Sequence, residues 1–143
     1  MGGRDTDHVL ELLSSVDLFE GLDRKHLKMV RGLCREHSFD AGMVIVEVGA
    51  NDKRFFLLLE GTADIFNGDR YAKSVGPGGY FGEVSVLDGG PRTASIKTAT
   101  AVHAVSIASF NLKALLRENP AMAVKLLEAL CGRLRTLTGA STS

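Results

Sequence analysis

Tryptophan is absent from this chain of 143 residues, only 6% of the residues are aromatic, and cysteine occurs twice, as Cys34 and Cys131. Two cysteines are too few for a disulfide framework and suit a reducing environment, so we expect a cytoplasmic protein. No apolar run approaches the roughly 18 residues of a membrane-spanning helix, and no secretory signal is visible. We therefore expect no contact with a membrane.

An excess of charge of either sign is also missing, because 17 Lys and Arg balance 17 Asp and Glu. A free-standing nucleic-acid-binding domain usually carries a basic excess, so direct binding to nucleic acid is not expected. The chain does have 45% hydrophobic residues, which suffice for the core of one domain. Its 16 glycines indicate the many tight turns of a small β protein.

The spacing of apolar residues divides the chain into three parts. Residues 1–37 are expected to form helices, and Asp23 is well placed to cap the second of them. Residues 38–108 contain short alternating or continuous apolar runs and are expected to form a β-roll. Within this part Asn67-Gly68 predicts a hairpin, because both residues tolerate a positive φ. In the first helix expected within residues 1–37, the apolar face consists of Val9, Leu12, Leu13 and Val16.

Residues 109–138 return to helical spacing. Ser109 can cap a first helix, and Pro120 both stops that helix and suits the first turn of the next. The final helix carries an a/d stripe over about two heptads. A stripe this short either packs on its own domain or joins two copies of the chain into a homodimer, and the spacing leaves both open. The stripe consists of Ala123, Leu127, Leu130, Leu134 and Leu137.

The residues with a recognisable chemistry begin at Gly82, which permits a close approach of the backbone to a ligand. The amides of Val84 and Ser85, at the start of a helical turn, form a ready anion site. Arg92 adds a guanidinium fork that suits the paired oxygens of a phosphate. Glu83 only accepts hydrogen bonds, so its place beside an anion site makes sense if it binds a sugar hydroxyl.

Other interpretations of these residues stay open on spacing alone. The glycines can be loop punctuation, and Glu83 with Arg92 can be a surface ion pair of little energetic value. The glycines match neither the dinucleotide fingerprint nor a P-loop. A metal-dependent or serine-nucleophile enzyme is not expected, because His103 is the only histidine of the expected β region and no Gly-x-Ser-x-Gly elbow occurs.

The segment resembles the phosphate-binding cassette of the cyclic nucleotide-binding domain family, which includes catabolite gene activator proteins and the regulatory modules of cyclic-nucleotide-dependent kinases. The resemblance extends over nearly the whole chain and implies a single domain over residues 1–143. It implies an α+β, mainly β fold: an eight-stranded antiparallel, jelly-roll-like β-roll flanked by N-terminal and C-terminal helices, with a short helix in the cassette at 81–95. The motifs that carry it are Phe81-Gly82-Glu83-Val84-Ser85-Val86-Leu87, Pro91-Arg92-Thr93-Ala94 and Leu58-Leu59-Glu60-Gly61-Thr62-Ala63.

The resemblance also implies a ligand, cAMP or cGMP, and no catalytic activity, metal or further cofactor. Glu83 would bond the ribose 2′-hydroxyl, and Arg92 would hold the equatorial phosphate oxygens. Gly82 would allow the close approach, while Ile65 would pack against the ribose or base. Binding would be transmitted through the C-terminal helix. The other phosphate contacts would come from the amides near Val84, Ser85 and Thr93.

Two departures from the family limit what the resemblance implies. We expect no helix-turn-helix after the last helix, whereas the bacterial activators of the family have one there. The place of the hydroxyl residue that those activators present to adenine falls near Leu137 and Thr138, so base contacts and the choice between cAMP and cGMP stay open. The alternative function is a degenerate member of the family that has lost its ligand and binds proteins, which the intact Glu83 and Arg92 disfavour.

Overall fold

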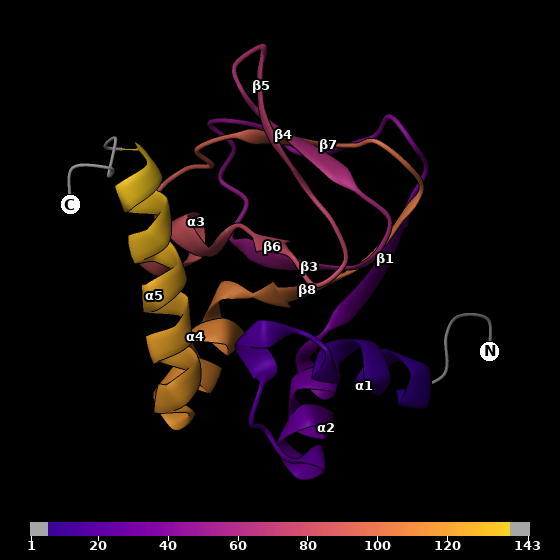
Figure 1. Ribbon diagram of the computed structural model, residues 1–143, viewed down its shortest axis with the longest axis vertical. Coiled ribbons are helices and arrows are strands. Elements are labelled where there is room, and N and C mark those ends of the chain that lie inside the picture. Colours follow the sequence, from indigo (N-terminus) through magenta and orange to yellow (C-terminus); the bar gives the residue numbers. More distant parts are fainter. Residues whose placement is uncertain (1–5, 138–143) are drawn as a thin grey trace.

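The computed structural model describes residues 6–137 (Figure 1). Within them eight strands form two four-stranded antiparallel sheets, in the orders β1-β8-β3-β6 and β2-β7-β4-β5. The expected eight-stranded β-roll is therefore confirmed. The strands are β1 Arg35–Phe39, β2 Val44–Val46, β3 Arg54–Glu60, β4 Ala63–Asn67, β5 Arg70–Val75, β6 Tyr80–Phe81, β7 Ser95–Thr98 and β8 Val102–Ala108.

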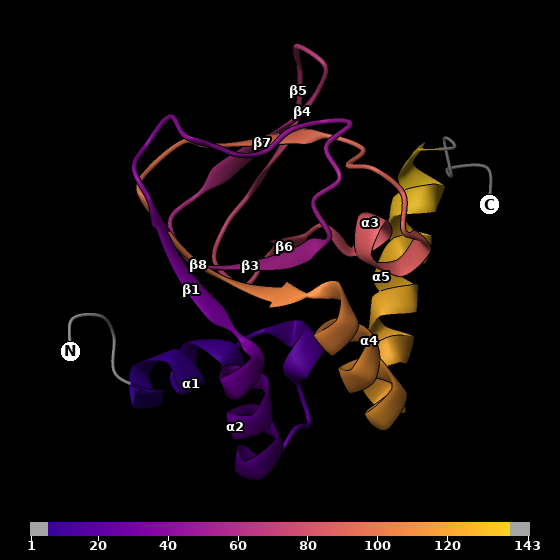
Figure 2. The same cartoon turned by 180° about the vertical axis from the view of Figure 1, so that it is seen from behind.

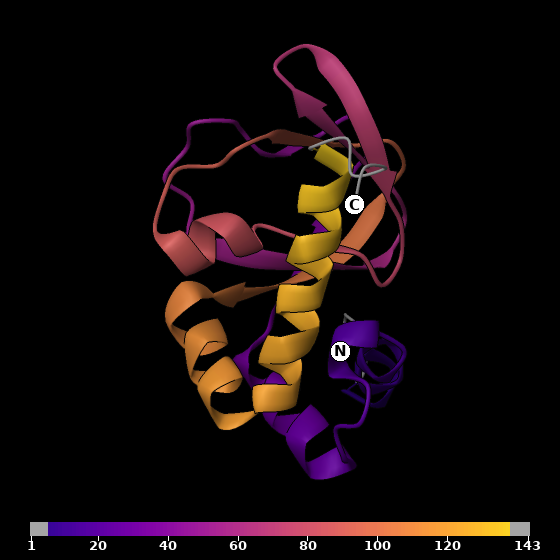
Figure 3. The same cartoon turned by 60° about the vertical axis from the view of Figure 1, so that its left-hand side comes forward.

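Helices cover the outer face of the first sheet and one side of the roll. Figures 1 and 2 show α1, α2 and α4 below the strands, and Figure 3 shows α5 rising from α4 past α3. The short α3 follows β6 directly, so it lies between the two sheets and the C-terminal helices. The helical segments are α1 Thr6–Ser14, η1 Asp17–Phe19, α2 Arg24–Leu33, α3 Glu83–Asp88, α4 Ser109–Glu118 and α5 Pro120–Leu137, of which η1 is a 3₁₀ turn.

The central strand β3 divides the core into two clusters. Its continuous apolar run is buried on both faces, which explains why the sequence shows no alternation there. Phe55, Leu57 and Leu59 pack against the helices, whereas Phe56 and Leu58 pack between the two sheets. A strand packed on both sides is a rigid support, and β6, which leads into α3, pairs with it through Phe56 and Leu57.

The N-terminal helices follow the predicted pattern, with one boundary moved. Asp23 caps α2 by accepting a hydrogen bond from the amide of His26 at 2.9 Å, as expected. The predicted helical part ran to residue 37, but the structure ends α2 at Leu33 and begins β1 at Arg35. Cys34 lies between them, and burial raises the pKa of its thiol to about 12, so the thiol stays protonated.

One turn prediction is correct in place but wrong in detail, and one helix-cap prediction is wrong. The β4–β5 hairpin forms where Asn67-Gly68 predicts it, but Asn67 pairs with Arg70, so Gly68 and Asp69 make the turn. Only Gly68 among them has a positive φ, of 64°, which excludes the type I′ turn with two such residues. Ser109 does not cap α4: it is the first helical residue, and its hydroxyl donates to the carbonyl of Val86 in α3.

The buried face of α5 is not the predicted stripe. Pro120 does separate α4 from α5, as expected, but Met122 and Leu126 are the α5 residues that enter the core. Leu127 and Leu134 of the stripe are 59% and 60% exposed, and the side chain of Leu137 lies outside the described residues. None of the described helices, the 18-residue α5 included, has the length and apolarity to cross a bilayer.

This difference between adjacent leucines predicts different stabilities. Leu126→Ala should lower the free energy of unfolding by about 2–5 kcal/mol, because it leaves a cavity in the core. Leu127→Ala, the matched control, should change it by less than about 0.5 kcal/mol, because its side chain already lies in water. Urea unfolding of both variants measures the difference. Equal losses would show that α5 packs through the stripe after all.

Candidate functional site

The site begins at Gly82, between β6 and α3. Gly82 has φ 94° and ψ −1°, a left-handed conformation that L side chains rarely adopt. A Cβ atom there would lie 2.6 Å from the carbonyl oxygen of Arg54 and closer still to Nη1 of Arg92. Glycine is therefore required twice, by the backbone conformation and by the two groups that approach it.

The first turn of α3 presents backbone donors. Its first helical hydrogen bond runs from the amide of Val86 to the carbonyl of Gly82, at 3.1 Å. The amides of Glu83, Val84 and Ser85 therefore have no acceptor within the helix, and they sit at its positive end. The buried hydroxyl of Ser85 donates to the carbonyl of Pro91 at 3.1 Å, which joins this turn to the segment carrying Arg92.

Arg92 is a buried cation that is only partly satisfied. The residue is 4% exposed, its Nη2 donates to the carbonyl of Arg54 at 2.5 Å, and Nη2 lies 3.3 Å from Oδ1 of Asp52. Burial lowers the pKa of Arg92, and the charge of Asp52 opposes that shift. Nε and Nη1 are buried and have no hydrogen-bond partner. Buried polar groups in native proteins are almost always hydrogen-bonded, so these two donors are available to an acceptor such as an anion.

A second charged residue of the site, Glu83, is 1% exposed and lies one residue after Gly82. Burial lowers the pKa of Arg92, and the charge of Glu83, like that of Asp52, opposes this shift. An ionised carboxylate only accepts hydrogen bonds, so beside an anion it requires a neutral donor such as a hydroxyl. The structure thus places four of the predicted site residues, Gly82, Glu83, Ser85 and Arg92, close together.

The other predicted site residues take more peripheral places. Val84 is half-buried within α3, and Thr93 is exposed directly after Arg92. Ile65 lies on β4 in the second sheet, where it is half-buried and packs against the cluster between the sheets. Its Cα partner is Ile96 of β7, the strand that follows the cassette. Ile65 therefore lies beside the strand into which the cassette leads.

Sequence reasoning missed the residues that hold Arg92 from the loop before β3. Arg54 donates to Asp52 through Nε at 3.0 Å and Nη2 at 2.9 Å. Burial alone would raise the pKa of the Asp52 carboxyl, but these bonds and the charges of Arg92 and Arg54 keep it below its usual value. The signal was the charged triplet at 52–54 immediately before the apolar run at 55–59, but such a triplet resembles an ordinary polar loop.

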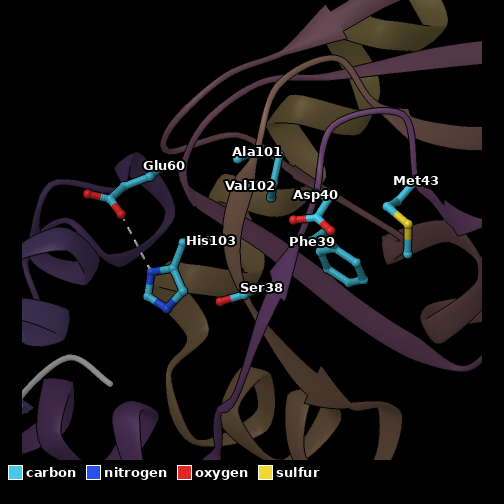
Figure 4. Close-up of a pocket in the computed structure, with 8 residues that line it drawn as sticks. All are labelled: Ser38, Phe39, Asp40, Met43, Glu60, Ala101, Val102 and His103. Carbon is cyan, nitrogen blue, oxygen red and sulfur yellow. Dashed lines mark ion pairs between the residues drawn. The ribbon is translucent and has the colours of Figure 1, made fainter. Parts of the chain in front are cut away.

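A separate pocket of about 380 Å³ lies across the roll from α3, beside β1 (Figures 1 and 4). There Nε2 of His103 contacts Oε1 of Glu36 at 2.9 Å, and Nδ1 lies 3.9 Å from Oε1 of Glu60. None of the predicted site residues lines this pocket. Its lining consists of Ser38, Phe39, Asp40, Met43, Glu60, Ala101, Val102 and His103.

The moved start of β1 places two histidines on adjacent strands. Nε2 of His37 in β1 contacts the hydroxyl of Ser106 at 2.7 Å, whereas His103 of β8 contacts Glu36. The two imidazoles therefore have different hydrogen-bond partners. Across residues 6–137, no group of three or more His, Cys, Asp or Glu side chains is placed to hold a metal ion.

The sequence model of the cyclic nucleotide-binding domain matches residues 36–119. This match covers more than half of the chain and includes the whole cassette, so the chain belongs to the cyclic nucleotide-binding domain family. The resemblance drawn from the sequence is confirmed.

Curated relatives include channels and transcriptional regulators. A cyclic nucleotide-gated potassium channel of Mesorhizobium japonicum is 30% identical over 113 residues, which are 79% of this chain and 31% of the channel. A CRP-like cAMP-activated global transcriptional regulator of Mycobacterium tuberculosis is 28% identical over 130 residues, 87% of this chain and 58% of the regulator. The chain thus spans less than two thirds of the length of either relative.

Solved structures share the fold over most of the chain. The catabolite activator protein of Thermus thermophilus has a TM-score of 0.80 at 26% identity, over 87% of this chain and 61% of that one. The domain PKAR CBD2, solved with Sp-2Cl-cAMPS bound, has a TM-score of 0.79 at 25% identity, over 92% of this chain and 90% of that one.

The double requirement for glycine at 82 predicts a graded effect. Gly42→Ala is the matched control, because Gly42 has φ 81° with no atom near its missing Cβ. It should cost about 1–2 kcal/mol of folding free energy through the left-handed conformation alone. Gly82→Ala should cost more and displace Arg92 as well. Thermal unfolding compares the two, and an equal loss would mean that the approach of Arg92 to Gly82 is unimportant.

Proposed function

We propose that this chain is a regulatory module that binds cAMP or cGMP in the cassette of residues 81–95 and has no catalytic activity. The observation that carries the proposal is the buried guanidinium of Arg92, whose Nε and Nη1 have no hydrogen-bond partner and which lies beside the first turn of α3. A cyclic phosphate supplies an anion with paired oxygens, which matches a guanidinium fork and helix amides together.

Each site residue then has a role in binding the nucleotide. Arg92 and the amides near Val84, Ser85 and Thr93 hold the phosphate, and Gly82 lets it approach the backbone. Glu83 accepts a hydrogen bond from the ribose 2′-hydroxyl, which explains a buried carboxylate beside an anion site. Ile65, on the facing sheet, packs against the ribose or base.

The family relationship supports both cyclic nucleotides, and two of the relatives favour cAMP. The mycobacterial regulator is described as cAMP-activated, and the PKAR domain carries a cAMP analogue. The alternative, a degenerate fold that binds only proteins, has less support. A buried Arg92 with two unpaired donors is costly, and a domain that binds no anion would gain nothing that offsets this cost. Calorimetric titration with cAMP and cGMP decides whether the chain prefers cAMP, prefers cGMP or binds neither nucleotide.

The main test of the cassette is Arg92→Ala. Charge-assisted hydrogen bonds contribute roughly 1.5–3 kcal/mol, so the variant should bind cAMP about 10- to 100-fold more weakly. Thr93→Ala, the neighbouring exposed position, should change affinity much less because its amide remains. Calorimetry on folded protein, checked by circular dichroism, measures both. Unchanged affinity in a folded Arg92→Ala variant would disprove the assignment of this cassette.

We further propose that residues 6–137 themselves contact neither nucleic acid nor a membrane and that the protein is cytoplasmic. The balanced charge supports the first point and two free cysteines support the second. Heat of binding on titration with duplex DNA or anionic vesicles would contradict the proposal that residues 6–137 contact neither.

A homodimer through α5 stays a prediction. The exposure of Leu127 and Leu134 supports it, and sedimentation equilibrium tests it.

The contacts of α3 and α5 support transmission of binding through the C-terminal helix. Val86 of α3 belongs to the same core cluster as Met122 and Leu126 of α5, so a shift of α3 bears on α5 through shared packing. Lys125 in turn fastens α5 to the N-terminal part, since its Nζ donates to the carbonyls of Asp17 at 3.2 Å and Glu20 at 2.9 Å.

Hydrogen exchange tests this transmission. Saturating cAMP should slow exchange of amides from about Val124 to Leu137, because the nucleotide can shift the helix only by favouring one of its placements. Amides of β8, already deep in the core, serve as the internal control and should not change. Protection that rises only in residues 82–93 would show that the domain binds its ligand without transmitting anything through α5.

A further inference from the structure

Lys53 spans the gap between the loop before β3 and the far end of α3. Its Nζ donates to the carbonyl of Gly89 at 2.5 Å and to that of Gly90 at 2.8 Å. These carbonyls belong to the C-terminal end of α3, where a helix leaves acceptors unpaired and carries partial negative charge. Gly89 caps α3 in a left-handed conformation, with φ 76°. Lys53 therefore supplies the donor and the charge that the end of α3 lacks.

The segment that Lys53 holds is the turn that leads to Arg92. It consists of Gly89, Gly90 and Pro91, and its two glycines have no side chain with which to pack. Besides Lys53, the turn is held by three hydrogen bonds within the cassette: the amide of Gly89 donates to the carbonyl of Ser85 at 3.0 Å, the amide of Gly90 to Oδ1 of Asp88 at 2.7 Å, and the hydroxyl of Ser85 to the carbonyl of Pro91 at 3.1 Å. Backbone bonds with Gly49 and Ala50 join the next residue, Arg92, to the roll, and Lys53 adds a side-chain link from outside the cassette to the turn before it.

The backbone of Lys53 contacts the C-terminal helices. Its carbonyl accepts a hydrogen bond from the amide of Ser109, the first residue of α4, at 3.0 Å. The neighbours of Lys53 also reach the site, because Asp52 and the carbonyl of Arg54 hold Arg92. One residue thus joins the end of α3, the start of α4 and the loop that supports the guanidinium.

We propose that Lys53 is a positioning residue for the nucleotide site, which fixes the 89–91 turn so that Arg92 and the amides of α3 face the same phosphate. This inference rests on the proposed function of the cassette. Without the ammonium group, the turn must be ordered when the ligand binds, and that entropy cost weakens affinity. The link to Ser109 makes the same lysine a connection between the cassette and α4.

Three variants test the proposal by calorimetry with cAMP. Lys53→Met keeps the length of the side chain but removes the ammonium, and it should bind about tenfold more weakly. Lys53→Arg can still donate to both carbonyls and should stay within about threefold of the wild type. Lys73→Met is the matched control, since Lys73 is an exposed lysine on β5, and its affinity should not change. Equal affinity of Lys53→Met and the wild type would overturn the proposal.

A double-mutant cycle with Arg92→Lys separates positioning from general stability. If Lys53 acts by placing the guanidinium fork, Lys53→Met should cost much less affinity in the Arg92→Lys background, where the fork is gone. A purely structural effect would give equal losses in both backgrounds, and independent contributions of this kind would overturn the proposal.

Hydrogen exchange of the ligand-free protein gives a measurement that does not depend on binding. The amides of Gly89 and Gly90 should exchange several-fold faster in Lys53→Met than in the wild type or in Lys73→Met. Unchanged exchange would contradict the anchoring of the turn. If the wild type binds neither cAMP nor cGMP, the proposed function fails, and the exchange comparison still decides whether Lys53 anchors the turn.

Discussion

The burial of one guanidinium is the constraint on which the site depends. A permanent charge out of water is costly unless charges and hydrogen bonds surround it, and for Arg92 they come from separate parts of the chain. Asp52 approaches from the loop before β3, the carbonyl of Arg54 from the first residue of β3, and Glu83 from the start of α3. Gly82 has to lack a side chain because the guanidinium occupies that space. The fold thus brings two segments about thirty residues apart to one charge.

Features that depend on neighbouring residues could be predicted from the sequence. The cap at Asp23, the break at Pro120 and the glycine-flanked cassette each follow from local backbone chemistry, and the structure places all three as expected. Gly82 and Arg92 were accessible as candidate site residues for the same reason, because the residues of the cassette lie within about a dozen positions of one another. A local motif carries its own geometry, so it needs little knowledge of the rest of the fold.

Features that depend on distant contacts could not be predicted. The stripe on α5 has regular spacing, but which side of a helix is buried is decided by the surfaces it meets, and these turned Met122 and Leu126 inward. Ser109 has the side chain of a typical N-cap residue, yet its hydroxyl donates a hydrogen bond to the nearby carbonyl of Val86 instead. Asp52 and Lys53 resemble loop residues until the cassette folds against them.

The same distant contacts determine how the ligand can act. In the ligand-free chain Arg92 already has a partial partner in Asp52, so a phosphate gains only the difference between its own bonds and those it disturbs. The loop carrying Asp52 holds Arg92, the end of α3 and the first residue of α4 at once. A change in any of these contacts therefore changes the environment of the others. Through the loop before β3, the cassette and the first residue of α4 therefore share contacts with the same residues.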